Sequence, residues 1–106
     1  MNSSRQPVDP HNYYLSQITS ILGRIFRDKK CSIYLFGSRA TDKYTPVSDF
    51  DIGVLASDNI SRELSAAREM LEVFNIPFTV DLVDLSTSPG TFVRKVKEQG
   101  IVIWNS

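Results

Sequence analysis

The stretch Cys31-Ser-Ile-Tyr-Leu-Phe-Gly-Ser38 is an apolar run that stops at a glycine and a serine, and the chain returns to apolar residues at Ser48-Asp-Phe-Asp-Ile52. Both runs are rich in the β-branched and aromatic residues of buried strands. They predict strands over Cys31–Phe36 and Phe50–Leu55, joined by a loop that contains Pro46.

Two aspartates stand at the start of the second strand. Successive side chains of a strand point to opposite faces, so Asp49 and Asp51 project together while Phe50 and Ile52 point into a core. Two carboxylates on one side suit Mg²⁺, which takes its remaining ligands from water and phosphate. Without a cation they repel, and burial would push one toward protonation. We therefore favour metal ligands over the solvated start of an edge strand, and we expect Gly53 to leave space above both acids.

The residues after the first strand predict a phosphate-binding turn. Gly37 allows close backbone approach, and a helix over Arg39–Lys43 would aim free N–H groups at an anion. Ser38 could cap that helix, donate its hydroxyl to a triphosphate, or do both. Arg39 could pair with phosphate oxygens through its planar guanidinium or be an exposed surface arginine, and Lys43 has the same two interpretations with less support.

The remaining elements follow from apolar periodicity and from cap and breaker residues. Helices alternate with strands, which implies a sheet covered by helices. The predicted elements are a helix that starts at Asp9-Pro10 with Asp9 as its cap, a helix over 60–74 that Pro77 ends, a strand over Phe78–Val83, a helix from Ser88-Pro89 to Gly100, and a strand over Ile101–Trp104.

Composition limits the classes of function. The 106 residues fit one domain, 1–106, and twelve basic and twelve acidic residues give a net charge of zero. A long RNA or DNA substrate is therefore disfavoured. No apolar stretch approaches the roughly 20 residues that span a bilayer, and residues 1–10 are too polar for a signal peptide, so we expect a soluble cytoplasmic protein without a membrane partner.

The single cysteine and the single histidine do not indicate a catalytic pair. Cys31 lies in a predicted buried strand, which fits an inert core thiol in a reducing cytoplasm. We interpret His11 as a surface residue, and Tyr13 and Tyr14 as rim and core residues rather than a platform for stacking bases.

These motifs resemble the minimal nucleotidyltransferases of the DNA polymerase beta-like superfamily. The family signature is an apolar strand, Gly-Ser, a spacer, Asp-x-Asp on the next strand and a third acid on a later strand. The resemblance runs from about residue 32 to residue 85, and the matching residues are Gly37, Ser38, Asp49, Asp51 and Asp81. The chain departs from the family in having Thr41 and Asp42 where a glycine is frequent. Aspartate tolerates a left-handed backbone, but its charge could weaken nucleotide binding.

The resemblance implies a fold and an activity. The fold would be α/β (α+β), a single small domain with a mixed β-sheet flanked by helices. The activity would be Mg²⁺-dependent transfer of a nucleoside monophosphate, AMP from ATP or the equivalent from another NTP, to a hydroxyl. Asp49 and Asp51 would hold Mg²⁺, and Asp81 would hold the second of two ions or act as the base. Gly37, Ser38 and Arg39 would bind the nucleotide. Asp84 is a poorer third acid because it faces the other side of its strand.

The resemblance also implies a partner. Minimal nucleotidyltransferases often occur with a small helical HEPN protein, as antitoxin and toxin, and some attach AMP to a tyrosine of that partner. We therefore expect a HEPN-type acceptor. One alternative is a catalytically idle binding module that neutralises its partner by contact. Another is a nucleotidyltransferase acting on a small molecule or antibiotic, which the absence of a predicted acceptor domain disfavours.

Overall fold

The computed structural model describes residues 10–106, so the cap predicted at Asp9 lies outside the described residues. The described chain contains three α-helices, four strands and two short 3₁₀ helices. In chain order they are α1 (Pro10–Phe26), β1 (Cys31–Phe36), η1 (Gly37–Ala40), β2 (Phe50–Ala56), α2 (Ser61–Val73), β3 (Val80–Asp84), η2 (Leu85–Thr87), α3 (Gly90–Gln99) and β4 (Ile101–Asn105).

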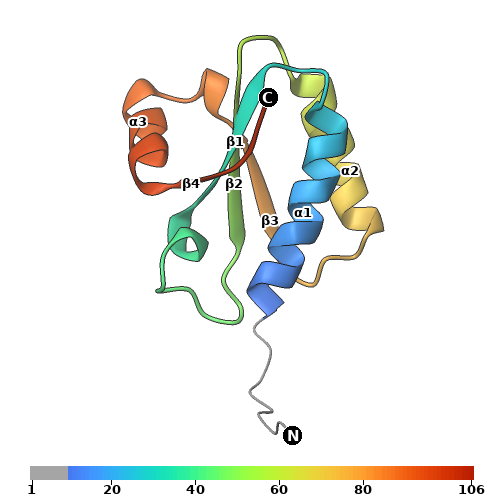
Figure 1. Ribbon diagram of the computed structural model, residues 1–106, viewed down its shortest axis with the longest axis vertical. Helices are drawn as coiled ribbons and strands as arrows, with labels where there is room; N and C mark the ends of the chain where they lie inside the picture. The colour runs from blue at the N-terminus through green and yellow to red at the C-terminus, as the bar shows by residue number, and fades with distance from the viewer. Residues whose placement is uncertain (1–9) are drawn as a thin grey trace, which may run out of the picture.

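The four strands form one mixed sheet in the order β3-β2-β1-β4. The strand β1 pairs antiparallel with both β2 and β4, whereas β2 and β3 are parallel. Parallel neighbours need a crossover, and α2 supplies it. Figure 1 shows α1 and α2 on one side of the sheet and α3 on the other. The predicted mixed sheet flanked by helices is confirmed.

The alternation along β2 divides its side chains between two cores. Phe50, Ile52 and Val54 are fully buried in the larger core, under α1 and α2. The alternate residues of β2, namely Asp51, Gly53 and Leu55, face α3. On that side Leu55 packs against a smaller cluster of buried residues that includes Tyr34. The predicted inward face of β2 is confirmed, and Asp51 lies on the α3 side.

The space expected above the acids at Gly53 is filled. A β-carbon on Gly53 would lie 2.7 Å from Leu85 Cδ1, and Leu85 is 1 % exposed. The expectation of open space there is wrong, because η2 turns back over the sheet immediately after β3 and places Leu85 on the glycine. Gly53 therefore accommodates a core side chain.

Several element boundaries differ from the sequence-based predictions. The helix expected over Arg39–Lys43 is the 3₁₀ helix η1, which begins at Gly37 itself. Its N-cap is Phe36 and has no side-chain cap, so the interpretation of Ser38 as the cap is wrong. The strand β3 begins at Val80, two residues later than predicted, and the ring of Phe78 packs against that of Phe50 at a centroid distance of 5.6 Å.

The start of α3 also differs. The helix begins at Gly90, with Pro89 at the N-cap and without a side-chain cap. Ser88 instead closes η2, and its hydroxyl donates to the Asp84 carbonyl over 2.9 Å. The sequence pattern of serine followed by proline thus marks the end of one short helix rather than the cap of the next.

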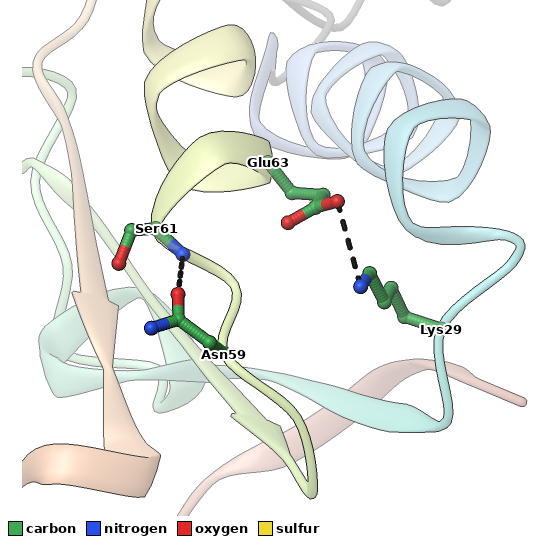
Figure 2. A network of polar contacts seen from close by, with 4 residues as sticks. All are labelled: Lys29, Asn59, Ser61 and Glu63. Atoms are coloured by element: carbon green, nitrogen blue, oxygen red, sulfur yellow. Dashed lines mark hydrogen bonds and ion pairs between the residues drawn. The ribbon is translucent and has the colours of Figure 1, made fainter.

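An ion pair connects the start of α2 with the loop before β1, and a hydrogen bond closes the turn that leads into α2. Lys29 Nζ lies 3.7 Å from Glu63 Oε2, and the Ser61 N–H donates to Asn59 Oδ1 over 2.9 Å (Figure 2). Ion pairs near the surface contribute about 0 to 1 kcal/mol. The packing of α1 beside α2 therefore depends mainly on their buried apolar residues.

Candidate functional site

Three predicted carboxylates meet at one end of the sheet. In the parallel pairing of β2 with β3, Asp51 lies opposite Asp81. Residues directly opposite each other on paired strands project to the same face. Asp49 immediately precedes β2 and lies two positions before Asp51, the spacing at which side chains of an extended chain project to the same face. Asp51 is partly buried, whereas Asp49 and Asp81 are exposed.

The charge of Asp51 is unfavourable in this position. Burial raises the pKa of its carboxyl above the ordinary value, and the negative charges of Asp81 and Asp49 raise the pKa further. Both effects penalise the ionised form. A cation at this end of the sheet would offset the repulsion and favour all three carboxylates in their charged state.

Gly37 is required by its contact with Asp51. Its φ is +73°, in the left-handed region that side chains other than glycine rarely adopt. A β-carbon at this position would overlap Asp51 Oδ2. The preceding residue, Phe36, is the register partner of Asp51 between β1 and β2. Here the group that approaches the glycine closely is a carboxylate of the same chain.

Arg39 is a buried anchor of the loop that follows. It is 2 % exposed, so the alternative of an exposed surface arginine is wrong. Its Nε donates to the Ser48 carbonyl over 3.1 Å, and its Nη2 donates to the Pro46 carbonyl over 3.5 Å. These bonds tie η1 to the loop that leads into Asp49. The geometry favours a positioning role over phosphate contact, and the nucleotide-binding role of Arg39 stays a prediction.

The interpretation of His11 as a surface residue is also wrong. The imidazole is 9 % exposed and stacks on Tyr44 at a centroid distance of 4.5 Å. Its Nδ1 lies 3.2 Å from Arg39 Nη1, and because a guanidinium only donates, Nδ1 accepts. The position of His11 on the apolar stripe of α1, seven residues before Ile18, is a sequence signal that could have identified it.

Aromatic rings complete the surroundings of Arg39. The guanidinium carbon lies 4.4 Å from the ring centroid of Phe50, 4.7 Å from that of Tyr44 and 4.9 Å from that of Phe78. A cation is attracted to such ring faces, more strongly when water is excluded. The turn beside the carboxylates is thus held from α1, β2 and the segment before β3 together.

The turn after η1 needs no glycine. Thr41 Oγ1 donates to the Ser38 carbonyl over 2.8 Å and accepts from the Lys43 N–H over 3.0 Å. Within residues 10–106, Asn75 alone among residues other than glycine has a positive φ, so Asp42 is not left-handed. Asp84 Oδ1 accepts from the Ser86 N–H, and that carboxylate caps η2 instead of joining the three acids.

The carboxylates fit a divalent cation by their chemistry. Carboxylate oxygens, here from three aspartates, are the ligand type that Mg²⁺ prefers. Burial first and the neighbouring negative charges second raise the pKa of the Asp51 carboxyl, which a cation would counteract. In the part of the chain that the structure describes, no group of three or more acidic, imidazole or thiolate side chains is arranged to hold an ion as it stands. Asp49 and Asp81 are exposed and would have to turn toward the ion. Their metal-binding role therefore stays a prediction.

The sequence matches the polymerase beta nucleotidyltransferase family over residues 17–106. The chain belongs to this family. Among curated proteins, none is detectably similar to it. Within residues 10–106, no helix combines the length and the apolar character needed to cross a bilayer.

Solved structures of toxin–antitoxin complexes share the fold. A MntA–HpeT complex with two aspartate-to-glutamate substitutions has a TM-score of 0.63 and 27 % identity, covering 83 % of this chain and 73 % of the other. A toxin–antitoxin structure with AMP-PNP has a TM-score of 0.61 and 33 % identity over the same shares. The tri-AMPylated HEPN toxin of Shewanella oneidensis in complex with its MNT antitoxin has a TM-score of 0.59 and 27 % identity, covering 87 % of this chain and 73 % of the other.

Proposed function

We propose that the chain is a Mg²⁺-dependent nucleotidyltransferase that moves AMP from ATP to a hydroxyl of a HEPN-type protein and acts as the antitoxin of that pair. The observation that carries the proposal is the convergence of Asp49, Asp51 and Asp81 beside the left-handed Gly37. Family membership supports the reaction class. Similarity to complexes that contain AMP-PNP or an AMPylated toxin supports the nucleotide and the acceptor. A cytoplasmic location, where ATP is available, is part of the proposal.

Each residue has a role in the proposed reaction. The oxygen of the acceptor hydroxyl bonds to the α-phosphorus, and the bond from that phosphorus to the bridging oxygen breaks, so that pyrophosphate leaves with the electron pair. Asp49 and Asp51 would hold Mg²⁺, and Asp81 would hold a second ion or take the hydroxyl proton. Bound Mg²⁺ would neutralise charge on the attacking and leaving oxygens. Gly37 and Ser38 would bind the phosphates through backbone N–H groups.

The substitution pattern of one relative supports the assignment of the acids. In the MntA–HpeT variant, the two substituted aspartates are two positions apart, as Asp49 and Asp51 are here. The buried Arg39 would act indirectly in this scheme, by fixing the turn between η1 and Asp49.

Intact mass measurement tests the proposal. The chain is incubated with Mg²⁺, ATP and the small helical protein encoded by the neighbouring gene. We expect one or more AMP additions on that protein, and we expect them to disappear with Asp49→Asn. Asp58→Asn, an exposed aspartate after β2, serves as the matched control and should leave the additions unchanged.

A stable complex without any mass change, under every nucleotide and metal tried, would contradict the enzymatic proposal. It would favour the alternative in which the fold neutralises its partner by contact alone.

A further inference from the structure

The buried His11 connects the first turn of α1 with the loop that leads into β2. Figure 1 shows the start of α1 and this loop at the same end of the sheet. The imidazole stacks on Tyr44 of the loop and on Phe50, the first residue of β2. The centroid distances are 4.5 Å and 5.6 Å, and the interplanar angles are 19° and 23°. One side chain of α1 thus contacts both the loop and the strand that follows it.

The hydrogen bond between His11 and Arg39 defines the state of the imidazole. The two nitrogens, Nδ1 and Nη1, are 3.2 Å apart, and a guanidinium can only donate. Nδ1 therefore carries no proton, and the proton of the neutral ring is on Nε2. A protonated ring would offer no lone pair to Arg39 and would set two cations beside each other. His11 thus supplies an acceptor that only the neutral imidazole provides.

Arg39 extends this constraint to the residue before Asp49. Its Nε donates to the Ser48 carbonyl over 3.1 Å, and its Nη2 donates to the Pro46 carbonyl over 3.5 Å. A planar guanidinium with its three nitrogens directed at three acceptors cannot rotate without losing hydrogen bonds. The acceptor on His11 therefore determines how Arg39 presents its other two donors. The backbone immediately before Asp49 is in this way fixed relative to α1.

The sheet does not hold Asp49 by itself. Asp49 is exposed and lies before the first residue of β2 that pairs with β1 or β3. A metal ligand binds well only when other groups fix its orientation. We propose that His11 is a positioning residue for Asp49: its Nδ1 orients Arg39, and Arg39 holds the loop so that Asp49 can join Asp51 at the cation. This inference rests on the proposed function.

Two substitutions separate the hydrogen bond of His11 from its packing. His11→Phe keeps an aromatic ring against Tyr44 and Phe50 and removes the acceptor. His11→Asn removes the ring and keeps an acceptor, because Oδ1 of asparagine is bonded to Cγ as Nδ1 of histidine is. Asn12→Ala, at an exposed position in the same helical turn, is the matched control.

Hydrogen exchange and titration calorimetry with Mg²⁺ and AMP-PNP measure the effect on the loop and on the site. In His11→Phe, the amides of residues 41–49 should exchange faster, by a larger factor than those of β1. Binding of AMP-PNP should weaken about tenfold, the lower end of the effect of losing a group that orients a metal ligand. His11→Asn should restore most of both properties. Asn12→Ala should behave like the wild type.

A merely structural role of His11 gives a different result. His11→Phe would then lower the stability to urea, while the folded protein keeps the loop exchange and the AMP-PNP affinity of the wild type. That result overturns the inference and leaves the proposed function standing. Equal weakening of binding by His11→Phe and His11→Asn also overturns the inference, because restoring the acceptor would then have no effect.

Two further outcomes are decisive. If His11→Phe does not fold, His11→Leu replaces it, since leucine and asparagine have a similar shape and differ in the acceptor. Tighter binding of AMP-PNP by His11→Asn than by His11→Leu supports the inference, and equal binding overturns it. If the wild-type chain does not bind AMP-PNP with Mg²⁺, alone or with its partner, the proposed function fails and the inference fails with it.

Discussion

A β-carbon on residue 37 would overlap the carboxylate of Asp51, so Gly37 and Asp51 depend on each other. The glycine satisfies two requirements together, a left-handed φ of +73° and the absence of a side chain under Oδ2. The pairing of Phe36 with Asp51 in the sheet fixes the separation between Gly37, the next residue, and Asp51. A double-mutant cycle can separate the two requirements.

Gly37→Ala should lower the free energy of unfolding by about 1 to 3 kcal/mol, because it adds backbone strain and forces the Asp51 carboxylate to move. The same change in an Asp51→Ala background should cost less, since only the strain remains. Urea denaturation measures all variants. Gly90→Ala is the control, because a β-carbon there meets no atom within 4 Å. Equal costs in both backgrounds would show that the carboxylate does not obstruct the site.

The raised pKa of Asp51 predicts a pH dependence of stability. The folded state binds the Asp51 proton more tightly than the unfolded chain does, so the free energy of unfolding falls as pH rises from the ordinary value of 3.8 through the higher folded pKa. Asp51→Asn should remove this fall and make the metal-free protein more stable than the wild type at neutral pH. Thermal melting across the acidic and neutral range measures the difference.

Bound Mg²⁺ and ATP should stabilise the wild type more than Asp51→Asn, the reverse of the order expected for the metal-free proteins. Mg²⁺ with ATP should raise the melting temperature of the wild type and not that of Asp51→Asn, because ligand that binds only the folded state stabilises it by mass action. Asp58→Asn should keep the wild-type response. A shift that persists in Asp51→Asn would mean that this carboxylate is not part of the site.

The buried guanidinium of Arg39 predicts a large loss of stability on its removal. Arg39→Met preserves much of the volume but leaves the Ser48 and Pro46 carbonyls without their donor, which should cost about 2 to 4 kcal/mol. Arg94→Met, at an exposed position on α3, should change the free energy of unfolding by less than about 0.5 kcal/mol. If Arg39→Met unfolds like the wild type but no longer binds nucleotide, Arg39 is a phosphate ligand and not an anchor.

The packing of Leu85 on Gly53 predicts a compensating pair of substitutions. Gly53→Ala should destabilise by about 1 to 3 kcal/mol, because its methyl group would lie 2.7 Å from Leu85 Cδ1. In a Leu85→Ala background the added methyl fills part of the cavity, so its cost should shrink or change sign. Chemical denaturation of the four proteins gives the coupling energy. Additive costs would show that the two residues do not contact in solution.

The elements that could be predicted from the sequence are those whose signal is local. The alternation of apolar residues in β2 predicted which face of the strand is buried and that Asp49 and Asp51 project together. The helical spacing of apolar residues predicted α1 and α2. The resemblance named Asp81 as the third acid, but the register that sets Asp51 opposite Asp81 is a finding of the structure that no pattern in the sequence predicted.

The features that were missed depend on residues distant along the chain. A buried arginine is tolerated only where its donors find acceptors, and those of Arg39 come from α1 and from the loop before β2. Leu85 covers Gly53 only because η2 reverses the chain after β3. Neither contact produces a periodic pattern within one segment of the sequence, so neither could be predicted from a local pattern.

The connectivity of the sheet suggests an order of assembly during folding. The strands β1 and β2 are antiparallel neighbours joined by one loop, and closing such a hairpin takes about 1 to 10 μs. Gly37, Ser38, Asp49 and Asp51 can therefore meet early. Asp81 arrives only after α2 has crossed the sheet and β3 has paired in parallel, which is the slower kind of contact. The repulsion among the three carboxylates is therefore complete only once β3 has joined the sheet, in the same step that adds Leu82 to the larger core and stabilises the fold.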